Sequence, residues 1–247
     1  MTQMRRVGVI GCGRIGAPLI DALQKGEAGQ NELVAILSRK PRGFGNLQSL
    51  TDVSSFLAES FDLIIDTATP ENFAAIGVQA LTVADVWTVN ATALADENLF
   101  KALEACGRAN SHRLRIVHGA IAGLDGVSTL AVDPEAHIEL RVDVAPSAEG
   151  RKTLFKGSVR GAAPLFPDSV NVALATGLCG TGLDNTQIEV VQPAEGEMRT
   201  LSLKGESRYG QLELSAMPAV RPDLAIHSVT ASIIAALRRD EEVIWVS

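Results

Sequence analysis

The sequence predicts an α/β protein, with an N-terminal parallel sheet followed by a second α+β domain built on an antiparallel sheet. Three observations lead to this prediction. A glycine-rich turn follows the first apolar segment, and strand-like and helix-like segments then alternate up to about residue 117, as a parallel sheet with connecting helices requires. Beyond Gly126 apolar and charged residues alternate instead, which is typical of half-exposed antiparallel strands.

The first predicted strand, residues 7–10, runs into three glycines at dinucleotide-binding spacing. Gly11 allows the tight turn, Gly13 lets the backbone approach a pyrophosphate, and Gly16 lets the next helix pack closely on the strand. That helix directs its free N–H groups toward the phosphates. An ordinary strand-to-helix turn is the alternative, but an amphipathic helix follows and favours a Rossmann-type turn. We assign the following residues of the turn to the cofactor: Gly11, Gly13, Arg14, Ile15 and Gly16.

The second predicted strand, residues 33–37, ends in Ser38, Arg39 and Lys40. An NAD-selective site usually has Asp or Glu at this tip, where it accepts a hydrogen bond from the ribose 2′-hydroxyl. A serine and two cations are instead suited to a 2′-phosphate, which Arg39 can bind through two parallel hydrogen bonds. The alternative is that Arg39, Lys40 and Arg42 form a solvated loop. The tip therefore predicts NADP(H), or use of both NADP(H) and NAD(H).

Strands and helices continue to alternate through the rest of the first domain. The predicted strands are residues 61–66, 87–89 and 114–117, and the predicted helices are residues 71–81 and 96–110. Such βαβ units form a parallel sheet with right-handed crossovers, and ligands bind at the carboxyl ends of its strands. We therefore also assign to the cofactor the residues that follow these strands: Thr67, Ala68, Thr69, Pro70 and Asn90.

The second domain is predicted to contain four strands and a helix of small residues. The strands are residues 138–144, 188–191, 200–203 and 211–215, and the helix is residues 170–178. A final helix, residues 226–239, is expected to return to the first domain, and residues 243–246 to add a short strand. We place the domains at residues 1–118, 119–225 and 226–247. The alternation leaves an apolar sheet face that the first domain need not cover, so a homodimer is expected.

Charge and composition exclude several kinds of binding partner and cellular location. A formal net charge of −7 argues against nucleic acid and anionic membrane surfaces. No apolar run approaches the roughly 18 residues of a membrane span, and no signal-peptide core is present at the N-terminus. The three cysteines lack CxxC spacing, which indicates reduced thiols rather than disulfides or zinc. We expect a cytoplasmic protein that acts on a small molecule and holds no metal.

Four blocks of the sequence carry a resemblance to a known family. They are residues 118–125, 154–158, 166–173 and 180–186. On these blocks, in this order, the chain resembles the L-aspartate dehydrogenase family, in which a Rossmann domain precedes a catalytic domain related in shape to dihydrodipicolinate reductase. The resemblance implies reversible oxidative deamination, in which hydride transfer to C4 of the nicotinamide converts an amine to an imine that water then attacks.

The resemblance also implies roles for individual residues. It places residues 67–70 beside the nicotinamide and residues 120–123 at the substrate, and we assign Ala120 to the cofactor and Ala122 and Gly123 to the substrate. Asn171 would begin a helix near the nicotinamide amide, although capping of that helix is an equally ordinary role for it. Asp125 is expected to serve in a turn or as an N-cap.

Three departures from the family fall on the substrate residues. The family's Asn-x-His element is replaced by residues 197–199, so Arg199 stands where the catalytic histidine is expected. The family's Asn-Pro-Lys-Thr-Ser element is replaced by residues 221–225, which begin with Arg221. His118 stands where the family usually has serine. An arginine stays protonated near neutral pH, so Arg199, Arg221 and Arg160 are candidates for binding substrate carboxylates.

His118 is the leading candidate for the displaced proton carrier, because it ends a strand at the catalytic edge and histidine titrates in the useful range. A histidine hydrogen-bonded to a loop is the alternative. His227 is a weaker candidate, and His112 and His137 are expected to be solvated.

Three functions are consistent with these residues. The first is a dehydrogenase or imine reductase acting on aspartate or another small amino acid. The second is an NADPH-dependent reductase of a different C=N or C=O substrate. The third is an NADPH-binding sensor without turnover, since the catalytic histidine is replaced.

Overall fold

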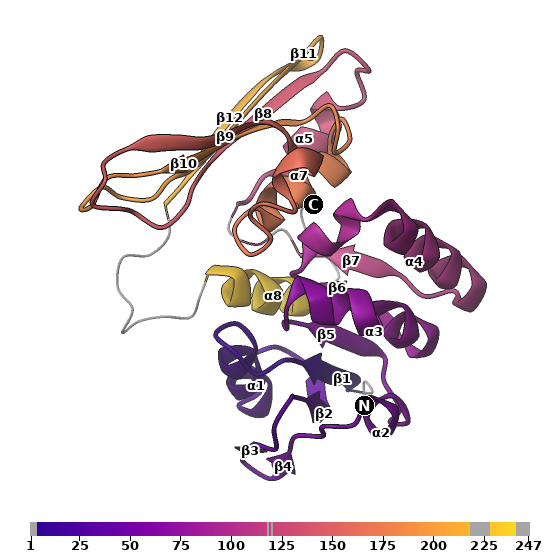
Figure 1. The fold of residues 1–247 in the computed structure, drawn as a ribbon. Coiled ribbons are helices and arrows are strands. Elements are labelled where there is room, and N and C mark those ends of the chain that lie inside the picture. Colours follow the sequence, from indigo (N-terminus) through magenta and orange to yellow (C-terminus); the bar gives the residue numbers. More distant parts are fainter. Residues whose placement is uncertain (1–3, 118, 120, 218–227, 241–247) are drawn as a thin grey trace. The chain divides into compact units, whose positions relative to one another are not determined.

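The computed structural model describes residues 4–117, 119, 121–217 and 228–240. The chain divides into two compact units (Figure 1). One unit is formed by residues 1–117 and 226–247, and the other by residues 118–225. The strand expected at residues 243–246 lies outside the described residues. Among those described, no helix is long and apolar enough to cross a membrane.

The first unit is built on a five-stranded parallel sheet in the order β2-β1-β5-β6-β7. The strands are β1 Arg5–Ile10, β2 Asn31–Leu37, β5 Leu63–Asp66, β6 Asp85–Thr88 and β7 Leu114–Ile116. The helices are α1 Gly16–Gln24, α2 Val53–Leu57, α3 Pro70–Val83, η1 Ala91–Ala95, α4 Glu97–Asn110 and α8 Ser228–Arg239, and β3 Gly43–Phe44 pairs with β4 Leu47–Gln48. The chain leaves β1 toward β2 on one side and returns to β5 on the other, so the strand order reverses between β1 and β5. Ligands of open α/β sheets bind at such a switch point.

Helices cover both faces of this sheet. Its strands are therefore buried on both sides and consist largely of apolar residues. Leu63, Ile64 and Ile65 of β5 are fully buried. Helix α8 belongs to this unit although it follows the whole second unit in the sequence. Its Ile233 and Leu237 share one core with residues of β1 and α1, and its Thr230 donates a hydrogen bond to the Ile15 carbonyl of the glycine turn at 3.0 Å.

The second unit contains a five-stranded sheet in the order β12-β11-β8-β10-β9. The strands are β8 His137–Asp143, β9 Lys152–Ser158, β10 Gln187–Gln192, β11 Leu201–Ser207 and β12 Gly210–Ala216, and the helices are α5 Leu124–Leu130, α6 Val159–Ala162 and α7 Asn171–Cys179. The sheet is built mainly from antiparallel pairs, as expected, and contains one parallel pair, β8 with β10. After β8, the chain forms the edge strand β9 and helices α6 and α7 before β10 enters in the direction of β8.

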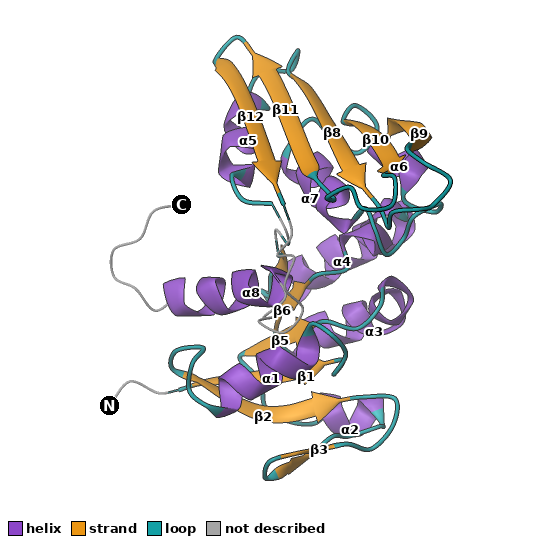
Figure 2. Cartoon of the chain, turned by 90° about the vertical axis from the view of Figure 1, so that its left-hand side faces the viewer, coloured by secondary structure: helices purple, strands orange, loops and turns teal. Residues whose placement is uncertain are grey.

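One face of this sheet is apolar and covered within the unit. Figure 2 shows α5, α6 and α7 on that face. Ile138 and Leu140 of β8 and Leu203 of β11 are buried there, while Glu139 of β8 and Lys204 of β11 alternate with them and are exposed. A homodimer was expected because an apolar face of this sheet need not be covered by the first unit. In the described residues, helices of the second unit itself cover the apolar face, and the opposite face is polar.

Candidate functional site

The three glycines of the turn after β1 have different physical reasons to be glycine. Gly11 has φ +90°, and a Cβ there would lie 2.8 Å from the Ala68 nitrogen. A Cβ on Gly16 would collide with the Gly11 carbonyl oxygen. A Cβ on Gly13 would meet nothing within 4 Å. Packing therefore explains Gly11 and Gly16, whereas at Gly13 the structure leaves open space of the kind that a closely approaching phosphate needs.

Helix α1 begins directly after this turn without a side-chain cap. Its N-cap residue, Ile15, makes no capping hydrogen bond, and the first turn contains no acidic residue. The Ala17 N–H already donates to the Gly13 carbonyl at 2.9 Å, and Pro18 has no N–H. The positive dipole end of α1 is thus what the helix offers to an anion. The turn and the helix together fit the pyrophosphate of a dinucleotide.

The tip of β2 is shaped by hydrogen bonds between serines. The Ser38 hydroxyl donates to the Lys40 carbonyl and bonds the Ser49 hydroxyl at 2.7 Å. The Ser38 proton is therefore used within the loop, and only the cations of the tip remain to meet a phosphate. Arg39 and Lys40 are both exposed.

Arg42 lies in the loop after β2 and is exposed, but its guanidinium has a partner in the glycine turn. Its Nη1 donates to the Cys12 carbonyl at 3.1 Å and lies 3.6 Å from the Cys12 Sγ. This contact connects the loop after β2 to the glycine turn after β1 and places a guanidinium beside that turn.

The residues after β5 connect the neighbouring strand ends. The Thr67 hydroxyl lies 3.0 Å from the carbonyl oxygens of both Ile10 and Gly11. Thr69 is the N-cap of α3, where its hydroxyl accepts from the Asn72 N–H at 3.4 Å. Pro70 occupies the first position of α3, where its missing N–H costs little.

Asp66, the last residue of β5, holds these loops together and was not identified from the sequence. Its Oδ2 accepts from the Thr88 hydroxyl and from Asn90 Nδ2, each at 2.7 Å, and its Oδ1 accepts from the Ala68 N–H at 3.2 Å. The residue is 1% exposed. Burial raises the pKa of the Asp66 carboxyl to about 6, although the three hydrogen bonds act in the opposite direction. The sequence did contain a signal for Asp66: it is an acidic residue at the end of a strand, β5, whose other residues are all apolar.

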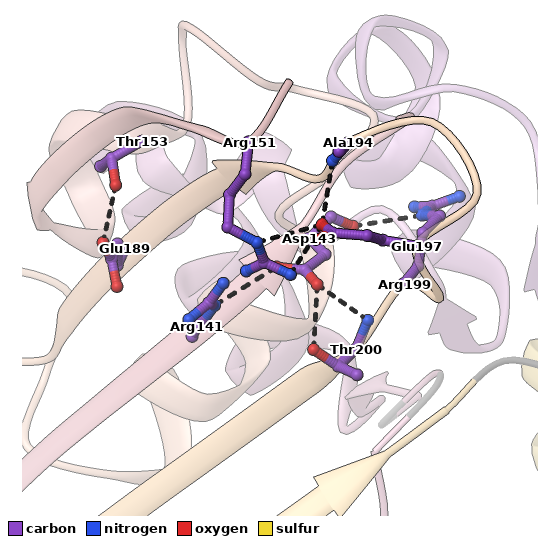
Figure 3. Close-up of polar contacts among 9 residues, drawn as sticks. All are labelled: Arg141, Asp143, Arg151, Thr153, Glu189, Ala194, Glu197, Arg199 and Thr200. Atoms are coloured by element: carbon purple, nitrogen blue, oxygen red, sulfur yellow. Dashed lines mark hydrogen bonds and ion pairs between the residues drawn. The ribbon is translucent and has the colours of Figure 1, made fainter. Parts of the chain in front are cut away.

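In the second unit, Arg199 lies in the exposed connection between β10 and β11 (Figure 3). Its Nε donates to the Asp143 backbone carbonyl at 3.2 Å. The Asp143 side chain is buried and accepts from Arg141 Nε and from both the N–H and the hydroxyl of Thr200. Asp143 thereby fixes the start of β11 and the guanidinium that precedes it.

Glu197, at the position of the family's asparagine, shapes the same connection. It accepts from the Ala194 N–H at 2.9 Å and pairs with Arg151. These contacts hold the pKa of the Glu197 carboxyl below its ordinary value. The Glu197 carboxylate thus closes the turn through residues 194–197 and is not left without protein partners to face a substrate.

Three of the residues assigned roles in the second unit lie at the starts of helices. Gly123 is the N-cap of α5 with φ +84°, a backbone conformation that favours glycine whatever lies beside it. Asp125 lies in the first turn of α5. The N-cap of α7 is Val170, which makes no side-chain cap bond, and Asn171 is the first residue of the helix.

One further candidate has a partner in the structure, and one expectation is corrected. Arg160, a candidate for a substrate carboxylate, forms a two-point ion pair with Asp184 at 2.7 and 2.9 Å. His112 is half-buried rather than solvated, with Nδ1 at 2.9 Å from the Leu81 carbonyl. His137 is exposed, as expected.

Several predicted residues lie outside the described residues: His118, Ala120, Arg221 and His227. Ala122 is described and exposed. Within the described part of the chain, no group of His, Cys, Asp and Glu side chains is arranged to hold a metal ion.

Comparison with known proteins matches both units. Residues 11–117 match the family model described as homoserine dehydrogenase, NAD binding domain, and residues 119–239 match the model described as aspartate dehydrogenase, C-terminal. The L-aspartate dehydrogenase 1 of Bordetella pertussis is 30% identical over 85% of each chain. The L-aspartate dehydrogenase 2 of the same organism is 29% identical over 92% of this chain and 95% of the relative. The crystal structure of aspartate dehydrogenase from Thermotoga maritima has the same fold, with a TM-score of 0.82 and 23% identity over 98% of this chain and 99% of that one.

Proposed function

The chain belongs to the L-aspartate dehydrogenase family, and we propose from this membership that it interconverts an aspartate-like amino acid and its imine or 2-oxo acid. It is an NAD(P)-dependent oxidoreductase of the class that acts on CH–NH₂ donors. The observation that carries the proposed substrate is the 30% identity to an L-aspartate dehydrogenase over 85% of both chains.

The nicotinamide cofactor supplies the hydride chemistry when bound, and the protein supplies binding, orientation and proton management. The turn from Gly11 to Gly16 binds the pyrophosphate in this proposal. The open space at Gly13 and the uncapped start of α1 support that role. The residues after β5 and β6, including Thr67 and Asn90, then line the nicotinamide half.

We propose NADP(H) as the preferred cofactor, with NAD(H) as the alternative. The support is the acid-free tip of β2, where Arg39 and Lys40 are exposed. Because the Ser38 hydroxyl donates within its own loop, the 2′-phosphate would be met by charge rather than by this hydroxyl. Two cations facing a phosphate dianion form charge-assisted hydrogen bonds, which are stronger than neutral ones.

Arg199 binds a substrate carboxylate in this proposal. Its Nε is engaged by the Asp143 carbonyl, which orients the guanidinium without neutralising it. A guanidinium keeps its charge at neutral pH and does not act as a proton carrier there. Proton transfer is assigned to His118, on the sequence argument that it follows the strand at residues 114–117 at the catalytic edge.

The test compares turnover with binding. NADPH oxidation in the presence of oxaloacetate and ammonia is measured beside fluorescence-detected NADPH binding without substrate. Turnover supports the proposed function. Arg199 at the histidine position favours a second candidate, a reductase of another C=N or C=O substrate, which turnover of a different oxo acid or imine alone would support. NADPH binding without turnover of any tested amino or oxo acid would instead indicate a sensor.

We further propose that the enzyme works as a cytoplasmic homodimer. Its cysteines Cys12, Cys106 and Cys179 are free thiols, as is usual in a reducing compartment. The proposed dimer is supported only by twofold symmetry being the commonest closed assembly.

A further inference from the structure

We propose that Asp66 is a positioning residue for the nicotinamide half of the cofactor. Its buried carboxylate fixes the Asn90 amide so that Asn90 Oδ1 accepts a hydrogen bond from a donor on the nicotinamide riboside. This inference rests on the proposed function only in requiring that the chain bind a nicotinamide dinucleotide.

The orientation of the Asn90 amide follows from the chemistry of its partner. An ionised carboxylate has no hydrogen to donate, whereas an amide carries two donors on nitrogen and an acceptor on oxygen. Asn90 Nδ2 lies 2.7 Å from Asp66 Oδ2, so the ionised acid selects this orientation over its flipped form. The acceptor Oδ1 is then on the opposite side of the amide from Asp66.

The Asp66 carboxylate also fixes the backbone of the loops that follow β5 and β6. Ala68 N–H donates to Asp66 Oδ1, and Thr88, which donates its hydroxyl to Oδ2, accepts from the Asn90 N–H at 3.0 Å. Asp66 and Thr88 are paired in register at the ends of β5 and β6. One side chain therefore sets the positions of the two loops that follow these strands.

The order of the strands assigns these loops to the nicotinamide half. In the strand order β2-β1-β5-β6 of the sheet, the tip of β2 carries the cations for the adenosine 2′-phosphate. The end of β1 carries the turn for the pyrophosphate. A dinucleotide lying across the carboxyl ends then extends its nicotinamide riboside over β5 and β6. Both the carboxamide and the ribose hydroxyls of that half carry hydrogen-bond donors.

The buried Asp66 carboxyl is held by hydrogen-bond donors and not by a cation. The carboxyl is almost fully buried, and in the part of the chain that the structure describes it forms no ion pair, only hydrogen bonds to neutral groups. A buried charge without a counter-charge opposes folding. Both oxygens of Asp66 accept hydrogen bonds, from Ala68, Thr88 and Asn90. An amide has only one acceptor oxygen, so an asparagine here would turn its NH₂ group toward a donor, and only an acid lets Asn90 keep its Nδ2 toward residue 66.

The experiment compares Asp66→Asn with the exchanged double variant Asp66→Asn/Asn90→Asp. The single variant places an amide opposite an amide and no longer selects the orientation of Asn90. We expect it to weaken NADPH and NADH binding at least ten-fold. The double variant restores a carboxylate facing an amide, with a carboxylate oxygen in place of Asn90 Oδ1, and should recover part of the affinity.

The fragment 2′,5′-ADP lacks the nicotinamide half and serves as the control ligand. Its affinity should be unchanged by Asp66→Asn. The matched control variant is Asp133→Asn, which removes another buried carboxylate, paired with Arg208 in the second unit, and should leave NADPH affinity unchanged. The 3-acetylpyridine analogue, which lacks the carboxamide N–H, identifies the donor. A weaker effect of Asp66→Asn on this analogue would indicate the carboxamide, and an equal effect a ribose hydroxyl.

Wild-type NADPH and NADH affinities in Asp66→Asn would overturn the proposal. So would an equal loss of 2′,5′-ADP and NADPH binding, which would indicate a general distortion of the nucleotide site. Failure of the double variant to regain any affinity would also count against it. All of these are binding measurements, so they are independent of whether oxaloacetate is turned over. If the wild-type chain bound neither dinucleotide, this inference and the proposed function would both fail.

Discussion

At the scale of single residues, Arg39 gives the most direct test of cofactor choice. Arg39→Ala should weaken NADPH binding by roughly 1–3 kcal/mol, the value of a lost charge-assisted hydrogen bond, and leave NADH binding nearly unchanged. Affinities from fluorescence titration of both cofactors check this. Arg108→Ala is the control, because Arg108 is an exposed arginine paired with Glu104 on α4. Equal losses for NADPH and NADH would show that Arg39 does not bind the 2′-phosphate.

Arg199 is tested by the separation of KM from kcat. A guanidinium that binds a carboxylate contributes equally to ground and transition states, so Arg199→Ala should raise the KM for oxaloacetate strongly and change kcat little. Arg199→His should restore proton exchange at this position and raise aspartate turnover. A fall in kcat without a change in KM would assign Arg199 to the chemical step instead.

Asp66 makes a prediction about stability as well as binding. Its carboxyl has a pKa of about 6 in the folded protein against an ordinary 3.8, so the folded state binds this proton more tightly than the unfolded chain. The stabilisation is complete below about pH 3.8 and is lost as the pH rises through 6. The shift corresponds to about 3 kcal/mol at ~1.4 kcal/mol per pKa unit.

Relative to Asp66→Asn, the wild-type free energy of unfolding should therefore fall as the pH rises from 5 to 8. Urea denaturation of both proteins at the two pH values measures this difference. A pH-independent difference between the two proteins would mean that Asp66 does not titrate in this range.

At the scale of elements, the glycine turn separates folding from binding. Gly13→Ala adds a methyl group to open space, so the protein should keep its wild-type melting temperature and lose dinucleotide affinity. Gly16→Ala forces a methyl group against the Gly11 carbonyl and should lower the melting temperature. Thermal unfolding without ligand and NADPH titration distinguish the two effects. Wild-type binding by Gly13→Ala would show that no phosphate approaches this position.

The secondary-structure elements also show which features can be predicted from a short stretch of sequence. Strands β1, β2 and β5 were predicted because they are continuous apolar segments bounded by turns. The edge strand β9 was not, because an edge strand keeps polar residues on much of its surface and resembles a loop. The parallel pairing of β8 with β10 was also missed, since alternation reports which face a residue occupies but not which strand lies beside it.

The candidate site follows the same division. Gly13, Arg39 and Thr67 were predicted because a chain-local rule, the position after a strand, identifies them. Asp66 was missed because its partners Thr88 and Asn90 lie 22 and 24 residues away in the sequence. The engagement of the Ser38 hydroxyl by Ser49 was equally invisible, because the two serines meet only when the β3–β4 hairpin folds back.

At the scale of the whole molecule, the oligomeric state is the open prediction. Light scattering at micromolar concentration should give twice the chain mass if the enzyme is a homodimer. The uncovered face of the second unit's sheet carries charged residues such as Glu139 and Lys204. An interface on that face would consist of polar contacts and would dissociate as salt rises. A monomeric mass at low salt would contradict the prediction.

The return of α8 to the first unit has a consequence for how the protein is made. Ile233 and Leu237, which complete the core beneath the glycine turn, are translated more than two hundred residues after it. The second unit, which is contiguous, has all of its strands before α8 exists. Synthesis of the cofactor-binding unit therefore starts before that of the second unit, but its core can be completed only after the second unit has been made.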